Sequence, residues 1–239
     1  MKTWSVLKER LRRFPAETDT KAVRALTAKQ WLTIARRTDT YLKGYKDRPG
    51  SDSRAQRRAA WLAQHGVFSE AKSVLELGCG CGRNLAELRR RYGVRFRVQG
   101  YDINPEAVTE CYRTMNINAS FARLDLYHLF PLDTQPSLQV HDVIFTVGVL
   151  GHLEQSAVKQ LVEWARQRAR QAVVLVEEPG LGTVAKGPRS WNAKKNTGDY
   201  VLWLHDYYSM FKSAILTIED LPMDLQAPAA TNLYVLKPT

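Results

Sequence analysis

The sequence lacks the features that would place the chain in a membrane or in a disulfide-stabilised class. No apolar run approaches the roughly 18–20 residues that a membrane-spanning helix needs. The basic start, MKTWSVLKERLRRF, is interrupted by charges where a secretory signal has its apolar core. Only three cysteines occur in 239 residues, an odd number without the spacing of a disulfide framework. We therefore expect a cytoplasmic protein with no membrane partner.

Metal-binding motifs are also missing. The CGC at residues 79–81 does not have the CxxC spacing of a zinc knuckle or a redox site, and no second pair follows it. We expect no metal ligands in this chain.

Acidic residues are scarce relative to basic ones, and the imbalance lies at one end. The chain has 35 Lys and Arg against 24 Asp and Glu, a formal net charge of +11. Residues 1–70 hold 16 of the basic and seven of the acidic side chains, so they carry +9 and the rest of the chain carries only +2. Such a lobe attracts nucleic acid or another anion, or it is simply a solvated helical surface, and the composition leaves both interpretations open.

The first part of the chain has helical periodicity. Trp4, Leu7, Leu11 and Phe14 recur at helical spacing, and further helical stretches follow up to Gly66, a typical helix stop. We interpret residues 1–60 as a basic helical cap and residues 61–239 as the main domain.

From residue 70 on, short apolar runs alternate with amphipathic segments. We predict five strands followed by a closing pair, at residues 73–77, 96–103, 120–126, 141–149, 172–178, 213–221 and 232–238. Helices are predicted at residues 83–93, 105–117 and 156–169. Strands that alternate with helices pair in parallel through right-handed crossovers, whereas the short connection between the last two strands requires antiparallel pairing. The sequence predicts an α/β fold: a doubly wound, seven-stranded, mostly parallel sheet with a C-terminal antiparallel hairpin.

The stretch VLELGCGCGRN, residues 74–84, ends the first predicted strand with an acid and three alternating glycines. It fails the dinucleotide fingerprint GxGxxG in both registers, because Arg83 or Leu85 stands at the third glycine, and no GK[ST] follows for a P-loop. Glu76 would repel a phosphate, whereas a carboxylate can hold an ammonium through charge-assisted hydrogen bonds. The turn therefore predicts a ligand that brings a cation. S-adenosylmethionine, with an amino-acid end, a sulfonium and no phosphate, fits.

This stretch resembles the first motif of the class I, Rossmann-like S-adenosylmethionine-dependent methyltransferases, and the resemblance covers roughly residues 60–239. It implies that Asp102, at the end of the second strand, accepts the ribose hydroxyls. It also implies that Asp125, at the end of the third strand, contacts the adenine amine while Leu126 flanks the ring. The cofactor-binding residues implied in the main domain are Glu76, Gly78, Cys79, Gly80, Asn84, Asp102, Ile103, Asp125, Leu126 and Val147. Trp31 and Tyr41 of the cap either line the cofactor cleft or pack in a core.

The end of the fourth strand bears on the methyl acceptor. VGVL at residues 147–150 is unlike the Asn/Asp/Ser-Pro-Pro-aromatic tetrad of methyltransferases that act on exocyclic amines of DNA bases. No cysteine follows a proline, as it does in cytosine C5 enzymes. GVLGHL is instead similar to small-molecule and sugar-pathway members, which places His152 at the lip of the pocket as a general base or as a cofactor-lining or capping residue.

An insert at about residues 179–211 follows the fifth strand and turns from flexible to strongly aromatic. Loops at this edge of a doubly wound sheet commonly shape the acceptor pocket. Its HDYYSMF segment resembles the same relatives, and it makes His205 and Asp206 further candidates for acid/base work or acceptor binding. The alternative is that its apolar residues bury a helix on the sheet.

We expect in-line transfer of a methyl group from S-adenosylmethionine to an oxygen or nitrogen of a small-molecule acceptor, a sugar or natural-product intermediate that is anionic if the basic residues of the insert bind it. The alternative is an RNA or protein methyltransferase that docks its acceptor on the basic N-terminal lobe. A binding module without turnover is disfavoured, because Glu76, Asp102 and Asp125 are all present.

Overall fold

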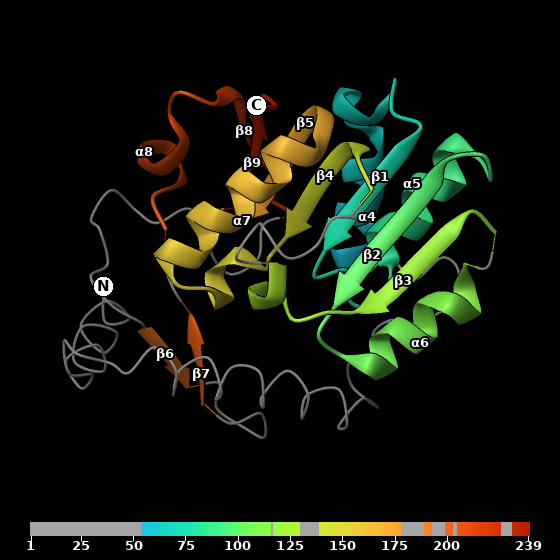
Figure 1. The fold of residues 1–239 in the computed structure, drawn as a ribbon, viewed down its shortest axis with the longest axis horizontal. Coiled ribbons are helices and arrows are strands. Elements are labelled where there is room, and N and C mark those ends of the chain that lie inside the picture. Colours follow the sequence, from blue (N-terminus) through green and yellow to red (C-terminus); the bar gives the residue numbers. More distant parts are fainter. Residues whose placement is uncertain are drawn as a thin grey trace.

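The protein was analysed as a computed structural model, which describes residues 54–115, 117–129, 139–177, 189–192, 199–202, 205–225 and 231–239. A seven-stranded sheet of order β3-β2-β1-β4-β5-β9-β8 forms its centre (Figure 1). The strands of this sheet are β1 Ser73–Leu77, β2 Arg97–Asp102, β3 Ala119–Arg123, β4 His141–Val147, β5 Ala169–Glu177, β8 Ile215–Asp220 and β9 Asn232–Leu236.

The pairing of the strands confirms the predicted topology. Strands β3, β2, β1, β4 and β5 are parallel to one another, whereas β9 runs antiparallel to both β5 and β8. Strand β1 lies between β2 and β4, so the crossovers on its two sides run in opposite directions. Because the three strands are parallel, their carboxyl ends lie at the same edge of the sheet. Ligands bind at that edge in doubly wound sheets.

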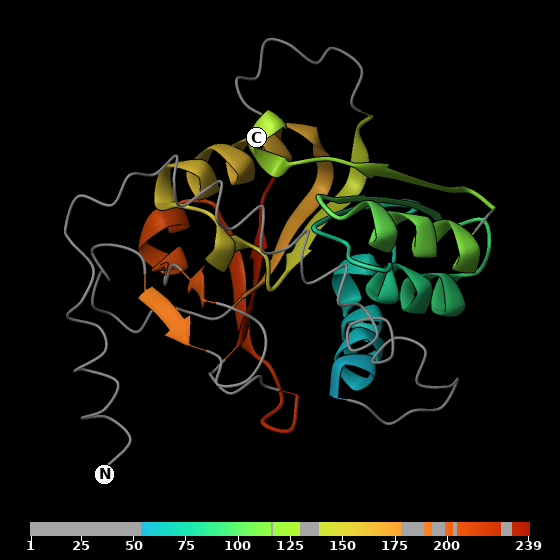
Figure 2. The same cartoon turned by 90° about the horizontal axis from the view of Figure 1, so that it is seen from below.

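Helices cover both faces of the sheet (Figure 2). One face carries α4 Arg54–Gln64, α5 Arg83–Tyr92 and α6 Pro105–Thr114, and the other carries α7 Gln155–Arg168 and α8 Tyr207–Phe211. Short 3-10 turns lie at η2 Gly66–Phe68, η3 Leu126–Leu129 and η5 Leu150–His152. A separate antiparallel hairpin consists of β6 Arg189–Asn192 and β7 Asp199–Leu202.

Local sequence explains where the helices begin and end. The Asn104 side chain caps α6 by accepting hydrogen bonds from the backbone N–H groups of Glu106 and Ala107, and Pro105 occupies the first helical position. Helix α6 ends at Thr114, three residues before its predicted end. Strand β3 likewise ends early, so that Asp125 lies in the turn after the strand and Leu126 opens η3.

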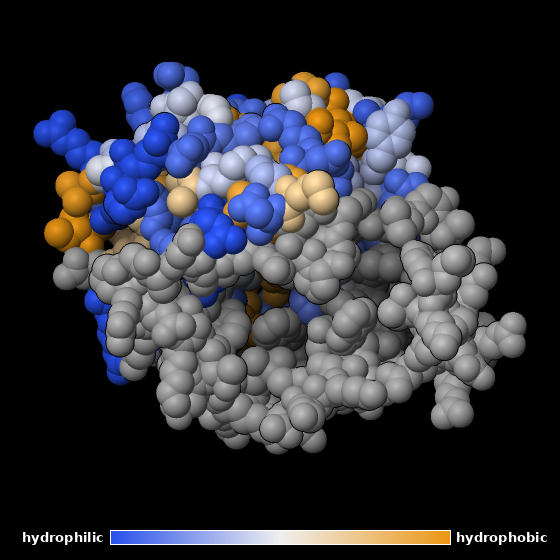
Figure 3. Space-filling model, turned by 180° about the vertical axis from the view of Figure 1, so that it is seen from behind, coloured by the Kyte–Doolittle hydropathy of each residue, from blue (hydrophilic) through white to orange (hydrophobic). Residues whose placement is uncertain are grey.

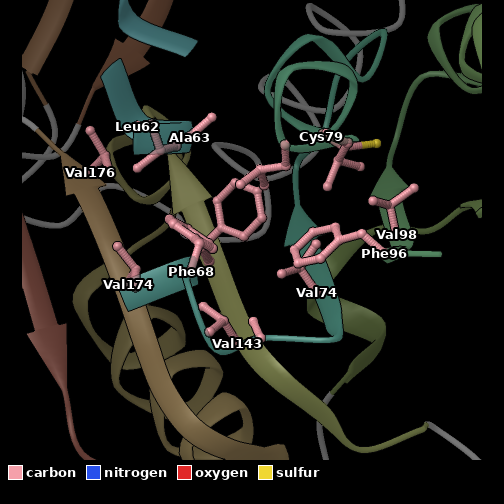
Figure 4. Close-up of a cluster of buried hydrophobic side chains, with 14 of the residues drawn as sticks. Leu62, Ala63, Phe68, Val74, Cys79, Phe96, Val98, Val143, Val174 and Val176 are labelled. Atoms are coloured by element: carbon pink, nitrogen blue, oxygen red, sulfur yellow. The ribbon is translucent and has the colours of Figure 1, made fainter. Parts of the chain in front are cut away.

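Two apolar clusters hold the layers together, and β1 contributes to both because its side chains alternate between the faces. Val74 belongs to the cluster under α4 and α5, and Leu75 to the cluster under α7. In the first cluster Leu62 of α4 and Phe68 pack onto the sheet (Figure 4). The ring of Phe68 meets that of Phe145 edge-on at 5.5 Å between centroids.

Helix α4 spans residue 60, where we placed the boundary between cap and main domain. It packs against α5, and the Arg58 guanidinium donates to the carbonyl of Leu225 at 2.8 Å and 3.1 Å. The rest of the predicted cap, residues 1–53, lies outside the described residues, so the division into two parts stays a prediction.

None of the helices in the described ranges is both long and apolar enough to cross a membrane. Figure 3 shows the described surface from behind, where hydrophilic residues predominate and apolar ones form small separate patches.

Candidate active site

The glycine turn, residues 78–82, connects β1 to α5 at the carboxyl edge of the sheet. Gly78, Gly80 and Gly82 have φ values of +75°, +53° and +77°, in the left-handed region that favours glycine. Gly78 has a second constraint, because a Cβ there would lie 2.4 Å from Cγ2 of Val149. The alternating glycines thus follow from backbone conformation and close packing.

Glu76 lies at the mouth of this turn and is almost fully buried, with 1% of its surface exposed. One carboxylate oxygen, Oε1, accepts a hydrogen bond from Nδ2 of Asn84 at 2.6 Å. The other, Oε2, has no hydrogen-bond partner among the described residues. Burial, with a smaller contribution from Asp102, raises the pKa of Glu76 to about 8, although the Asn84 hydrogen bond acts in the opposite direction. A buried acceptor in this condition favours a ligand that brings a positively charged donor.

Asp102 ends β2 next to the turn and holds it in place. Its Oδ2 accepts a hydrogen bond from the backbone N–H of Gly80 at 2.7 Å, and its Oδ1 accepts one from that of Asn104 at 2.9 Å. Burial raises the pKa of Asp102, and the backbone donors partly offset this. Each carboxylate oxygen can accept more than one hydrogen bond, so the ribose role remains compatible with this anchoring. Ile103 follows, half-buried.

The side chains of other predicted cofactor-binding residues, Asp125, Leu126 and Cys79, also contact the protein itself. Asp125 accepts a hydrogen bond from the N–H of Tyr127 at 3.1 Å through Oδ1, and Leu126 is buried in the cluster on the α7 face. The side chain of Cys79 lies in the opposite cluster (Figure 4), and its thiol donates to the carbonyl of Gly80 at 3.6 Å. The hydrogen bond with Cys111, followed by burial, raises the pKa of the Cys79 thiol well above its usual range.

The β4–α7 loop, Val147–Leu153, forms the next part of this edge. Gly148 turns the chain out of β4 with φ +66°, and η5 follows it. Val149 covers the glycine turn, as its contact with the Cβ position of Gly78 indicates. His152 ends η5 and is half-buried. Its backbone N–H donates to the carbonyl of Val149 at 3.0 Å.

His205 and Asp206 lie just before α8. The Nε2 of His205 lies 3.1 Å from the carbonyl oxygen of Leu150 and 2.9 Å from that of Leu153. Burial lowers the pKa of His205. Asp206 caps α8, because its Oδ1 accepts a hydrogen bond from the backbone N–H of Ser209 at 3.0 Å and its Oδ2 one from the Ser209 hydroxyl at 2.7 Å, and both bonds lower its pKa. The acid/base role of either residue stays a prediction.

Residues 74–172 match a protein-family model described as a methyltransferase domain. The matched segment is a methyltransferase domain. No curated protein sequence matches the chain.

Solved structures of other methyltransferases share the fold of this methyltransferase domain. 1,6-Didemethyltoxoflavin-N1-methyltransferase from Burkholderia thailandensis, with bound 1,6-didemethyltoxoflavin and S-adenosylhomocysteine, has a TM-score of 0.66 at 14% identity, over 95% of this chain and 92% of that one. Magnesium protoporphyrin IX methyltransferase from Synechocystis PCC 6803, with bound S-adenosylmethionine, has a TM-score of 0.61 at 12% identity, over 94% and 100%. DesVI from Streptomyces venezuelae has a TM-score of 0.60 at 17% identity, over 85% and 98%. At these identities the similarity establishes the Rossmann-like methyltransferase fold.

The structure does not describe the whole of the predicted site. Trp31 and Tyr41 lie outside the described residues. Of the acceptor insert, the structure describes the hairpin β6–β7, and β7 lies against η5. This contact brings the insert to the same edge as the glycine turn (Figure 1).

One residue at this edge was missed by sequence reasoning. Glu177 ends β5, is 2% exposed, and accepts hydrogen bonds from the Thr146 hydroxyl and from the backbone N–H groups of Val149 and Leu150. The sequence contained a signal for Glu177, because an acidic residue lies at the end of β5 just as Glu76 lies near the end of β1 and Asp102 at the end of β2.

Proposed function

We propose that the protein transfers a methyl group from S-adenosylmethionine to an oxygen or nitrogen of a small-molecule acceptor. The observation that carries the choice of methyl donor is the buried Oε2 of Glu76, which has no partner among the described residues and lies beside a turn that suits no phosphate. An α-ammonium group supplies the donor that this oxygen lacks. Solved relatives of the same fold that hold S-adenosylmethionine or S-adenosylhomocysteine support the assignment.

The residues at the carboxyl edge bind different parts of S-adenosylmethionine. Glu76 holds the ammonium end, Asp102 accepts the ribose hydroxyls, and Asp125 marks the adenine end. Bound S-adenosylmethionine supplies a methyl group on a sulfonium, a good leaving group. The main task of the protein is then to hold the acceptor atom in line with that methyl group, a positioning effect that lowers the barrier by up to roughly 7–11 kcal/mol.

A proton must leave when the acceptor is a hydroxyl or a protonated amine. We assign this step to His152, which lies on the loop that covers the glycine turn. Acceptors that arrive deprotonated need no such base.

Two observations support a small-molecule acceptor. The hairpin β6–β7 belongs to the insert after β5 and lies against η5, at the edge of the sheet where an acceptor reaches the cofactor. In addition, the toxoflavin and protoporphyrin enzymes with this fold are named for small-molecule acceptors. The cytoplasmic location stays a prediction.

The experiment uses donor labelled on the methyl group and an extract separated into small molecules, RNA and protein. We expect label in the small-molecule fraction with wild-type protein and none with Asp102→Ala, whose cofactor binding is impaired. Label confined to RNA or protein would replace this proposal by the alternative in which the basic N-terminal lobe docks the acceptor.

A further inference from the structure

The β4–α7 loop has two buried anchors from distant parts of the chain. We propose that Glu177 and His205 are positioning residues that hold this loop, and through it His152 and the glycine turn, in one arrangement. We call the hydrogen bonds of Glu177 and His205 to this loop the clamp. The clamp is a property of the fold, whereas its effect on catalysis rests on the proposed function.

Glu177 caps the start of η5 from the neighbouring strand. The residue at the N-cap position is Val149, whose side chain cannot accept a hydrogen bond from the N–H groups at the start of η5. Glu177 supplies two hydrogen bonds instead: Oε1 accepts from the N–H of Val149 at 3.1 Å and Oε2 from that of Leu150 at 3.2 Å. Oε1 also accepts from the Thr146 hydroxyl at 2.9 Å, which fixes the orientation of the carboxylate.

His205 contacts the carbonyl of the first residue of the same turn and that of the residue after it ends. The two groups that face its Nε2, the carbonyls of Leu150 and Leu153, can only accept hydrogen bonds, so Nε2 carries the hydrogen. The ring is 3% exposed and packs edge-on against Tyr207 at 5.6 Å between centroids. A three-residue turn is thus held by a carboxylate on its N–H groups and by an imidazole on its carbonyls.

The positions of Glu177 and His205 in the chain connect the clamp to the acceptor insert. The acceptor insert begins just after Glu177, and His205 lies in its last part, so η5 is bonded to the residue before the insert and to a residue near its end. The same loop covers Gly78 through the Val149 side chain. One buried network therefore sets the insert, the candidate base and the cofactor turn relative to one another.

Backbone amide exchange measures this clamp directly. The amide of Glu177→Gln has one acceptor oxygen in place of two, so it cannot accept from the N–H groups of both Val149 and Leu150 with separate oxygens, and its NH₂ group faces one of them. We expect exchange at Val149 and Leu150 to accelerate by on the order of tenfold to a hundredfold, with weaker binding of S-adenosylhomocysteine. The matched control is Glu87→Gln, the same change at a buried acid on α5 that accepts hydrogen bonds from Gln56 and Arg90. It should leave exchange at Val149 and Leu150 unchanged.

A pair of variants at His205 gives the same test if Glu177→Gln is too unstable to purify. The amide of His205→Gln can present an N–H near the original Nε2 position, whereas His205→Leu cannot. Exchange at His152 and Leu153 should therefore be near wild type in the glutamine variant and faster in the leucine variant.

Two results would overturn the proposal: unchanged exchange in Glu177→Gln, or His205→Gln and His205→Leu that behave alike. Wild-type protein that fails to bind S-adenosylhomocysteine would instead count against the proposed function, because the exchange measurements need no ligand.

Discussion

Replacing Glu76 by glutamine tests the electrostatics of the cofactor turn. Glutamine keeps an acceptor for Asn84 but cannot ionise. With a pKa of about 8, Glu76 is about nine-tenths neutral at pH 7, and ionising it to receive an ammonium costs about 1.4 kcal/mol there. The charge-assisted hydrogen bond contributes about 1.5–3 kcal/mol. The advantage of Glu over Gln should therefore be small at pH 6 and reach on the order of tenfold to a hundredfold in affinity near pH 8.

Calorimetric titration with S-adenosylhomocysteine between pH 6 and 8 is the appropriate assay, because this ligand keeps the amino-acid end and lacks the sulfonium charge. Binding at pH 7 should release close to one proton in wild type, which is seen as a dependence of the heat on the buffer, and none attributable to this site in Glu76→Gln. Glu87→Gln again serves as the control. An affinity ratio between wild type and Glu76→Gln that stays flat from pH 6 to pH 8 would refute the reasoning.

The same substitution has the opposite effect on stability. The pKa of Glu76 is higher in the folded protein, about 8, than its ordinary value of 4.5. Stability from this group is therefore fully present below pH 4.5 and is lost as the pH rises through 8. The loss in the ligand-free protein is on the order of 4 kcal/mol. Chemical unfolding at pH 8 should find ligand-free Glu76→Gln more stable than wild type, and a less stable variant would contradict the assigned burial cost.

Three further substitutions address the other parts of the site. Asp102→Ala should weaken cofactor binding by an order of magnitude or more in calorimetry, because a charge-assisted hydrogen bond is lost; unchanged affinity would remove Asp102 from the ribose role. His152→Gln should abolish turnover in the labelled-donor assay while cofactor affinity stays intact, and full activity would return His152 to a structural role. Gly78→Ala should lower the midpoint of thermal unfolding, since it combines a positive φ with a clash against Val149. Adding Val149→Ala should recover only part of that loss, and complete recovery would show that φ is unimportant.

The sheet was predictable from the sequence because each of its strands carries its own local signal. Apolar runs between helical segments located β1 at its observed bounds, and the short connection before β9 required antiparallel pairing, as observed. Strand and helix ends were less accurate. The hairpin β6–β7 was not predicted, because two four-residue strands are specified mainly by pairing with each other.

The candidate site was predictable to the extent that it is local. Glu76 and the glycines are neighbours in sequence, so their spacing alone indicated a cationic ligand. The clamp on η5 was not predictable, because Glu177 reaches Val149 across 28 residues and His205 reaches Leu150 across 55. Only the fold shows that His205, which the sequence made a candidate for acid/base work or acceptor binding, directs its Nε2 at backbone carbonyls.

All three cysteines of the chain are buried in the described structure, and two of them, Cys79 and Cys111, direct their thiols toward the carbonyl of Gly80. Burial also raises the pKa of Cys81 to about 12. Since only thiolates react readily with alkylating reagents, the closed protein should resist them. Cys79 and Cys81 lie between β1 and α5, so their modification requires that segment to open, and their rate of alkylation measures the opening without any introduced label.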